Sequence, residues 1–122
     1  MPDRFSSADL DAIRQARLAD IVTGPDGARR TTIWVVVDPQ DRVLVRSVRG
    51  RRGRWHRDLL TNPAGALEID GRQIPFVAQR ADDAERITAC SDALRAKYRP
   101  GGSLDSMLLE HTLPTTLELK HA

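Results

Sequence analysis

The fold is decided by Thr31-Thr-Ile-Trp-Val-Val-Val37, a run rich in β-branched residues that predicts a buried strand. Asp38-Pro-Gln-Asp41 follows as a tight connection, and Arg42-Val-Leu-Val-Arg-Ser47 predicts the second strand of a hairpin. A second hairpin is predicted at Asp70-Gly71, because this dipeptide separates two alternating runs and suits a two-residue turn. The strand-rich region as a whole spans 28–80.

Helices and a final strand are predicted on either side of this region. Ser6 and Ser7 precede a predicted helix at the N-terminus, which we assign to residues 1–22. A long helix is predicted over 82–98, since acidic residues begin it and basic residues end it, as the helix dipole favours. Residues 115–120 predict a last strand. Antiparallel hairpins with helices outside the sheet indicate an α+β fold whose sheet curls into a small barrel.

Size and composition set limits on the class of protein. The 122 residues predict a single domain, 1–122, and 40% hydrophobic with 30% charged residues is typical of a globular chain rather than a disordered one. The single cysteine, Cys90, excludes an internal disulfide and favours a reducing compartment. The sequence contains no apolar run long enough to span a membrane, so we expect a cytoplasmic protein. The three histidines lie far apart in the sequence, and no metal site is predicted.

Six arginines within twelve residues are the main indication of function. They lie in Arg46-Ser-Val-Arg-Gly-Arg-Arg-Gly-Arg-Trp-His-Arg57, a stretch that we call the arginine segment (46–57). The whole chain has a formal charge of only +2, so its positive charge is concentrated here. Guanidinium groups bind phosphate and carboxylate oxygens in pairs, and glycines let a backbone approach an anion closely. The segment therefore predicts a site for a phosphorylated or otherwise anionic small molecule.

Several short motifs along the chain resemble an uncharacterised bacterial family of domains of unknown function. This family is related to the split β-barrels that bind FMN or deazaflavins, which include pyridoxamine-phosphate oxidases and deazaflavin-dependent nitroreductases. The resemblance extends from about Asp26 to Leu119. The motifs are Asp26-Gly27, Thr32-Ile-Trp34, Leu44-Val-Arg-Ser47, Arg49-Gly50, Gly53-Arg-Trp55, Arg57, Lys97-Tyr98 and Thr116-Leu117.

The resemblance implies a specific fold and a specific kind of site. It implies a six-stranded antiparallel split β-barrel with flanking helices that forms a homodimer and binds FMN or a deazaflavin between its subunits. It also implies a nitroreductase-like oxidoreductase activity. The residues that we expect at the cofactor are Thr32, Arg46, Ser47, Arg49, Gly50, Arg51, Trp55 and Arg57.

Two other functions are compatible with the same residues. The protein could be a dimeric barrel without catalytic activity that senses a ligand or binds another protein. The arginine segment with Trp55 also has the basic and aromatic composition of modules that bind single-stranded nucleic acid. The absence of any recognised nucleic-acid motif makes this second alternative the less favoured one. No nucleophile, acid pair or other catalytic constellation is apparent, which is compatible with an enzyme whose cofactor performs the chemistry.

Overall fold

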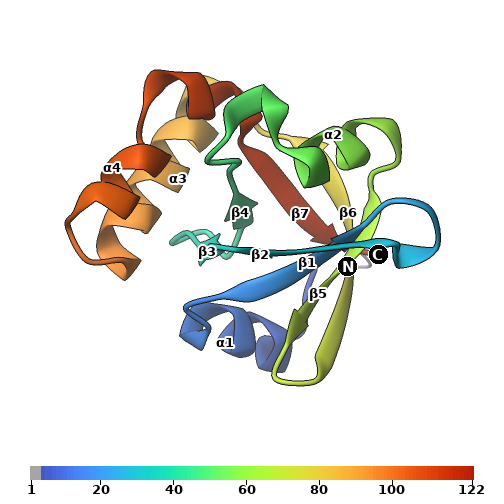
Figure 1. Ribbon diagram of the computed structural model, residues 1–122. Coiled ribbons are helices and arrows are strands. Elements are labelled where there is room, and N and C mark those ends of the chain that lie inside the picture. The colour runs from blue at the N-terminus through green and yellow to red at the C-terminus, as the bar shows by residue number, and fades with distance from the viewer. Residues whose placement is uncertain (1–3) are drawn as a thin grey trace.

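The computed structural model describes residues 4–122 and consists of a curled sheet with helices packed against it (Figure 1). Three short 3-10 helices, labelled η, lie in the connections between the main elements. In chain order the elements are α1 Ser7–Gln15, β1 Ala19–Thr23, η1 Pro25–Gly27, β2 Arg29–Ile33, β3 Val36–Val37, β4 Val43–Val45, η2 Gly50–Arg52, α2 Arg54–Thr61, β5 Ala64–Ile69, β6 Arg72–Arg80, α3 Ala84–Lys97, α4 Gly102–Met107, η3 Glu110–Thr115 and β7 Leu117–His121.

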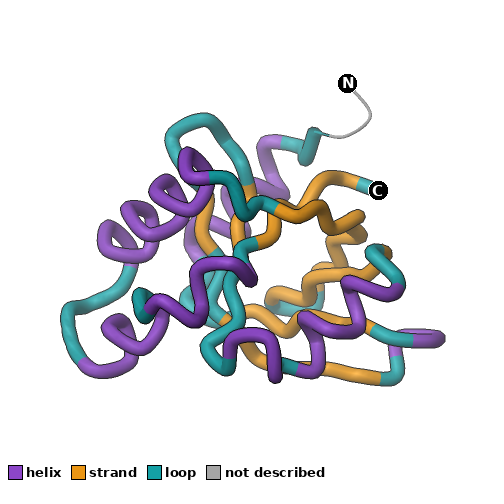
Figure 2. Tube along the Cα trace, turned by 90° about the horizontal axis from the view of Figure 1, so that it is seen from above, coloured by secondary structure: helices purple, strands orange, loops and turns teal. Residues whose placement is uncertain are grey.

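The strands form one antiparallel sheet whose two ends belong to the same stretch of chain. The strand order is β2-β1-β5-β6-β7-β4-β3, so β2 and β3 lie at opposite ends. In sequence they are separated only by Trp34 and Val35, where the chain leaves its partner β1 and joins β4. The sheet must therefore curl until its ends meet, and Figure 2 shows the strands surrounding a common interior.

The α+β barrel fold is confirmed, with one difference in the strand count. The predicted strand Thr31–Val37 is two strands, because the bend at Trp34 and Val35 changes its hydrogen-bonding partner. The seven described strands thus come from six continuous segments of chain. The predicted hairpin at Asp70-Gly71 is present: Ile69 pairs with Arg72, and both turn residues have positive φ, as a type I′ turn requires.

The barrel interior is filled by aliphatic and aromatic side chains from almost every strand. Ile21, Leu67, Ile74 and Phe76 are all fully buried, and Ile13 of α1 packs against the same core. A second cluster, which includes Leu44, Cys90 and Leu94, lies between β3, β4 and the helices α3 and α4. These two helices run side by side along one flank of the barrel (Figure 1).

The N-terminal prediction needs a correction. A helix over residues 1–22 was expected, but α1 ends at Gln15 and residues 19–23 form β1; residues 1–3 lie outside the described part of the chain. Ala16 already has extended backbone geometry. Strand β1 hydrogen-bonds to both β2 and β5, and Ala19, Ile21 and Thr23 are buried. Pairing on both edges and burial of one face outweigh the weak local helix preference of this stretch.

The other predicted boundaries differ from the structure by only a few residues. The long helix predicted over 82–98 is α3, which begins after Asp83, whose side chain accepts a hydrogen bond from the backbone N–H of Arg86. The strand predicted over 115–120 is β7, which begins two residues later than predicted. Residue 115 is the last residue of η3, and residue 116 directly follows it. The arginine segment contains η2 and the first half of α2.

Candidate functional site

A pocket of about 570 Å³ lies against the barrel at the point where the arginine segment leaves β4. Volumes of this size are typical of sites for small molecules and cofactors. Four parts of the chain form its walls. They are residues 29–34 in and after β2, residues 46–49 after β4, residues 53–55 at the start of α2, and Ser103, Ser106 and Met107 of α4, with Leu18 at the rim.

Strand β2 meets this pocket along its edge. Successive side chains of a strand point to opposite faces, yet all of residues 29–34 line the pocket. In the described sheet β2 pairs only with β1, so its other edge is not used by the sheet. We infer that unpaired backbone N–H and C=O groups of β2 face the pocket and can hydrogen-bond to a ligand.

Arg46 anchors the start of the arginine segment inside the protein. Its side chain is fully buried and uses four of its five N–H groups on protein acceptors. These acceptors come from α3, α4 and the residue before β7: the hydroxyls of Ser91 and Thr116 and the carbonyls of Ile87 and Met107, at 3.0–3.2 Å. Burial lowers the pKa of Arg46. The side chain therefore ties the pocket wall to the helices and has one N–H left for a ligand.

Ser47 is the polar residue of the pocket that most clearly indicates a ligand site. Its hydroxyl is buried and lacks a hydrogen-bond partner among residues 4–122, although Ser47 belongs to the pocket lining. It lies directly beside Gly53, where an added Cβ would be 2.2 Å from Ser47 Oγ. Gly53 is the N-cap of α2, and no side chain caps this helix end. A free hydroxyl and the free N–H groups of the first helical turn thus converge, as in many phosphate sites.

Some arginines around the pocket are paired with carboxylates and others are not. Arg29 donates from Nε to Asp58 at 2.6 Å, and Arg30 forms a bidentate pair with Glu68 at 2.7 and 2.8 Å. Burial alone would raise the pKa of Asp58, but hydrogen bonds from Arg29 and Thr23 outweigh burial and lower it. Arg49 and Arg54 also line the pocket, and neither has a hydrogen bond or an ion pair with any residue of 4–122. These two guanidinium groups remain available for an anion.

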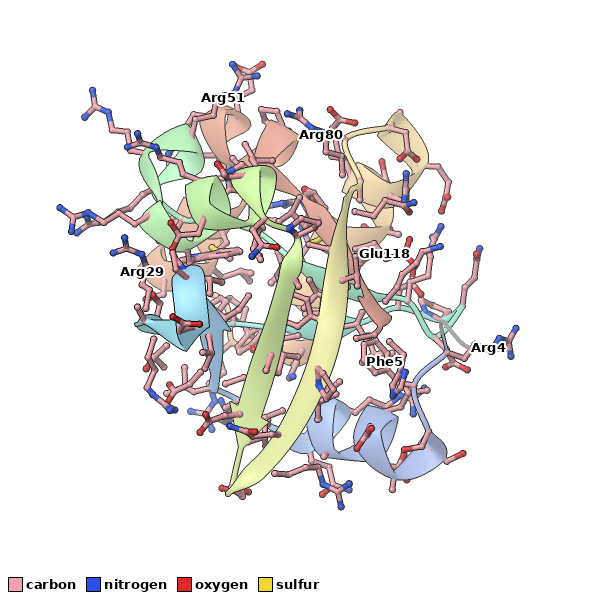
Figure 3. All side chains as sticks on the ribbon, turned by 90° about the vertical axis from the view of Figure 1, so that its right-hand side faces the viewer. Arg4, Phe5, Arg29, Arg51, Arg80 and Glu118 are labelled. Carbon is pink, nitrogen blue, oxygen red and sulfur yellow. The ribbon has the colours of Figure 1, made fainter. Side chains whose placement is uncertain are left out.

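The structure brings five of the eight predicted cofactor residues to this pocket: Thr32, Arg46, Ser47, Arg49 and Trp55. The other three lie outside its lining. Gly50 has positive φ and is packed against His111, where a Cβ would be 2.8 Å from the ring. Arg51 and Arg57 are exposed, and Arg51 extends at the end of the molecule farthest from α1 (Figure 3). Binding by these residues stays a prediction.

Sequence reasoning missed part of the pocket. Trp34 lies in the run that was predicted as a buried strand, but it is only half-buried, lines the pocket and stacks on Tyr98 with ring centroids 3.8 Å apart. Its position at a bend between two strands gave no local signal. Ser103, Ser106 and Met107 join the pocket through long-range packing of α4, which no motif near the arginine segment indicates.

His56 lies in α2 but not in the pocket. It is buried, and its Nδ1 has no partner in the described part of the chain. Burial, followed by the charges of Arg80 and Arg51, lowers its pKa and so favours the neutral ring. Figure 3 shows these two arginines at the same end of the molecule. Among residues 4–122 no three metal-binding side chains cluster, and no helix is long and apolar enough to cross a membrane.

Comparison with solved structures identifies this architecture as a split barrel. HutZ, the heme storage protein from Vibrio cholerae, superposes with a TM-score of 0.63 at 14% identity, over 98% of this chain and 91% of that one. A putative pyridoxamine 5′-phosphate oxidase from Listeria innocua gives 0.60 at 12% identity, over 94% and 90%. The FAD binding protein from Mycobacterium smegmatis gives 0.56 at 20% identity, over 97% and 89%. At such identities the likeness establishes the fold.

The family follows from the sequence itself. Residues 9–119 match the model of DUF2255, described as an uncharacterized protein conserved in bacteria. Because the match spans nearly the whole chain, the protein belongs to this family, as its motifs indicated. No curated protein matches the sequence.

Proposed function

We propose that the pocket binds the phosphate of a flavin-type cofactor, FMN or a deazaflavin, and that the protein is an oxidoreductase. The observation that carries this proposal is the buried hydroxyl of Ser47. It has no hydrogen-bond partner in the described part of the chain and lies beside the start of α2, which no described side chain caps. An unsatisfied buried hydroxyl is costly unless a ligand completes it. Arg49 and Arg54 supply charge at the same place.

The remainder of the pocket suits a flat ring system. Trp34 and Trp55 belong to its walls, and the free edge of β2 offers alternating donors and acceptors to polar ring atoms. Thr32 also lines this edge, although its hydroxyl already donates to Asp20 at 2.8 Å. When bound, the cofactor would supply hydride or electron transfer. The protein would hold its phosphate, orient its ring and limit access of water.

A second copy of the chain is proposed to complete the site. Leu18 and Val48 both line the pocket, yet about half of each side chain is exposed, at 57% and 50%. Large apolar side chains at the rim of a binding pocket are typical of surfaces that another protein covers. Light scattering should therefore find a dimer, and Leu18→Glu should shift it toward monomer.

The proposal is tested by fluorescence titration with FMN and, separately, with an 8-hydroxy-deazaflavin at physiological salt. The variant Arg49→Gln/Arg54→Gln removes the two free arginines of the pocket. The control Arg52→Gln/Arg99→Gln removes the same charge from two exposed positions outside it. We expect the first pair to weaken binding about tenfold or more and the control about twofold, since only the first pair contacts the anion.

Two results would overturn this function. Equal losses of cofactor binding in both double variants would mean that overall charge, rather than these two positions, determines binding. Tight, salt-dependent binding of oligonucleotides would then favour a nucleic-acid module. Binding of neither cofactor by the wild type would favour the barrel without catalytic activity that binds a different ligand or protein. Heme is a further arm of the titration, but no histidine of the described chain lines the pocket to ligate its iron.

A further inference from the structure

Lys97 is a half-buried cation without an anionic partner. It lies in the last turn of α3, and its Nζ donates to the carbonyls of Ile13 at 3.0 Å and Val35 at 2.7 Å. The first carbonyl belongs to the last turn of α1 and the second to the bend between β2 and β3. No carboxylate of residues 4–122 forms an ion pair with Lys97. The side chain thus links three elements through neutral acceptors alone.

These surroundings favour the neutral amine. Burial lowers the pKa of Lys97 to about 8, against an ordinary value of 10.5. The carbonyls of Ile13 and Val35 and the Tyr98 ring, whose centroid is 5.5 Å from Nζ, favour the cation, but burial outweighs them. A substantial fraction of Lys97 is therefore uncharged just above neutral pH, and the neutral amine is the nucleophilic form.

The two carbonyls also fix the direction of the amine. A neutral amine has two N–H groups and one lone pair, and both N–H groups have acceptors in Ile13 and Val35. The lone pair must then occupy the remaining tetrahedral position. Lys97 lines a second groove of about 570 Å³, which lies between α1, β3, α3 and the connection at 38–41, away from the arginine segment. We infer that a small reagent reaches the amine through this groove, because Lys97 is part of its lining and is only half-buried.

The other charged groups of this groove are already neutralised. Arg14 of α1 pairs with Asp41 and Asp11. On the remaining walls Asp38 pairs with Arg42, and Asp92 of α3 pairs with Arg95. No free carboxylate therefore restores the charge on Lys97, and none blocks an uncharged reagent.

We propose that Lys97 is an acylation site that reacts with small activated acyl donors such as thioesters. The amine nitrogen forms a bond to the acyl carbon, the carbon–sulfur bond breaks, and the leaving thiolate takes the proton that the nitrogen releases. No electron transfer is involved. The amide product has a single N–H, so only one of the carbonyls of Ile13 and Val35 keeps its donor. Val35 directly follows Trp34, which lines the pocket of the arginine segment. Acylation of Lys97 therefore alters hydrogen bonding to the backbone next to this pocket.

The chain provides its own control, because Lys97 and Lys120 are its only lysines. Purified protein is treated with the acetyl thioester of N-acetylcysteamine at several pH values, and acetylation of each lysine is followed by peptide mass spectrometry. We expect Lys97 to react at least about threefold faster than Lys120 at pH 8, with its rate levelling off above that pH. In guanidinium chloride that unfolds the chain, the two rates should become equal.

A Lys97→Arg variant distinguishes acetylation at Lys97 from a general change in the reactivity of the protein. It keeps a charged donor for the two carbonyls, and acetylation of Lys120 should continue at the wild-type rate. The proposal is wrong if Lys97 in the folded protein reacts no faster than Lys120, or if its advantage persists after unfolding. The test requires no bound cofactor, so it stands apart from the function proposed for the pocket.

Discussion

The arginine segment uses the same kind of side chain in two opposite ways. Arg46 is fully buried and hydrogen-bonds to Ser91, Thr116 and two carbonyls. Only a few residues later, Arg49 and Arg54 are exposed and have no hydrogen bond or ion pair within 4–122. A buried arginine with many acceptors supports the fold, whereas an arginine left without a partner at a pocket is free to bind. Stability and binding should therefore separate along this segment.

The largest effect is expected at Arg46. Arg46→Met should lower the free energy of unfolding by about 3 kcal/mol, because buried acceptors in α3, α4 and at Thr116 lose their donor. Urea unfolding followed by circular dichroism measures this change. The matched control Arg49→Met should stay within about 0.5 kcal/mol of the wild type, as surface substitutions do. Similar losses of unfolding free energy in both variants would contradict the different roles assigned to Arg46 and Arg49.

A smaller loss of stability is expected at Gly53. Gly53→Ala places a methyl carbon 2.2 Å from the oxygen of the buried Ser47 hydroxyl, so one of the two must shift. Overpacking of this kind costs about 1–3 kcal/mol. The double variant Gly53→Ala/Ser47→Ala should recover most of the loss, because the clashing atom is gone. Independent, additive effects in thermal unfolding would show that the two residues do not meet.

Ser47→Ala should affect binding more than stability. Removing an unpaired buried hydroxyl leaves the free energy of unfolding unchanged or slightly higher. Binding of FMN or the deazaflavin should weaken by about tenfold if the hydroxyl donates to the phosphate. Titration and urea unfolding of the same variant provide both values. A loss of stability with unchanged binding would place Ser47 among the residues that support the fold.

A further prediction concerns the dependence of stability on pH. Lys97 has a pKa of about 8 in the folded protein and an ordinary value of 10.5, so between these values the unfolded chain binds more protons. Its contribution to stability therefore rises as the pH increases from about 8 to 10.5. Urea unfolding at several pH values should show this rise in the wild type relative to Lys97→Met. Parallel pH curves for the two proteins would contradict the lowered pKa.

The candidate site could be predicted only in part, for reasons that differ between residues. Arg49, Ser47 and Trp55 were found because they lie within one basic stretch that precedes a helix. Arg46 was found too, but its burial depends on Thr116 and Ser91, which are distant in sequence. Trp34 was missed as a pocket residue because a strand pattern does not show where a strand bends.

The sequence by itself determined the local elements and the concentration of charge. The Asp70-Gly71 turn, the helix α3 with its charged ends and the arginine segment all follow from neighbouring residues. Tertiary structure decided which of the arginines is buried, that residues 19–23 form a strand, and that β2, α2 and α4 enclose a pocket. Turns and helix ends depend on residues a few positions apart. Burial, strand pairing and pockets depend on contacts between distant segments, which form only when the barrel closes.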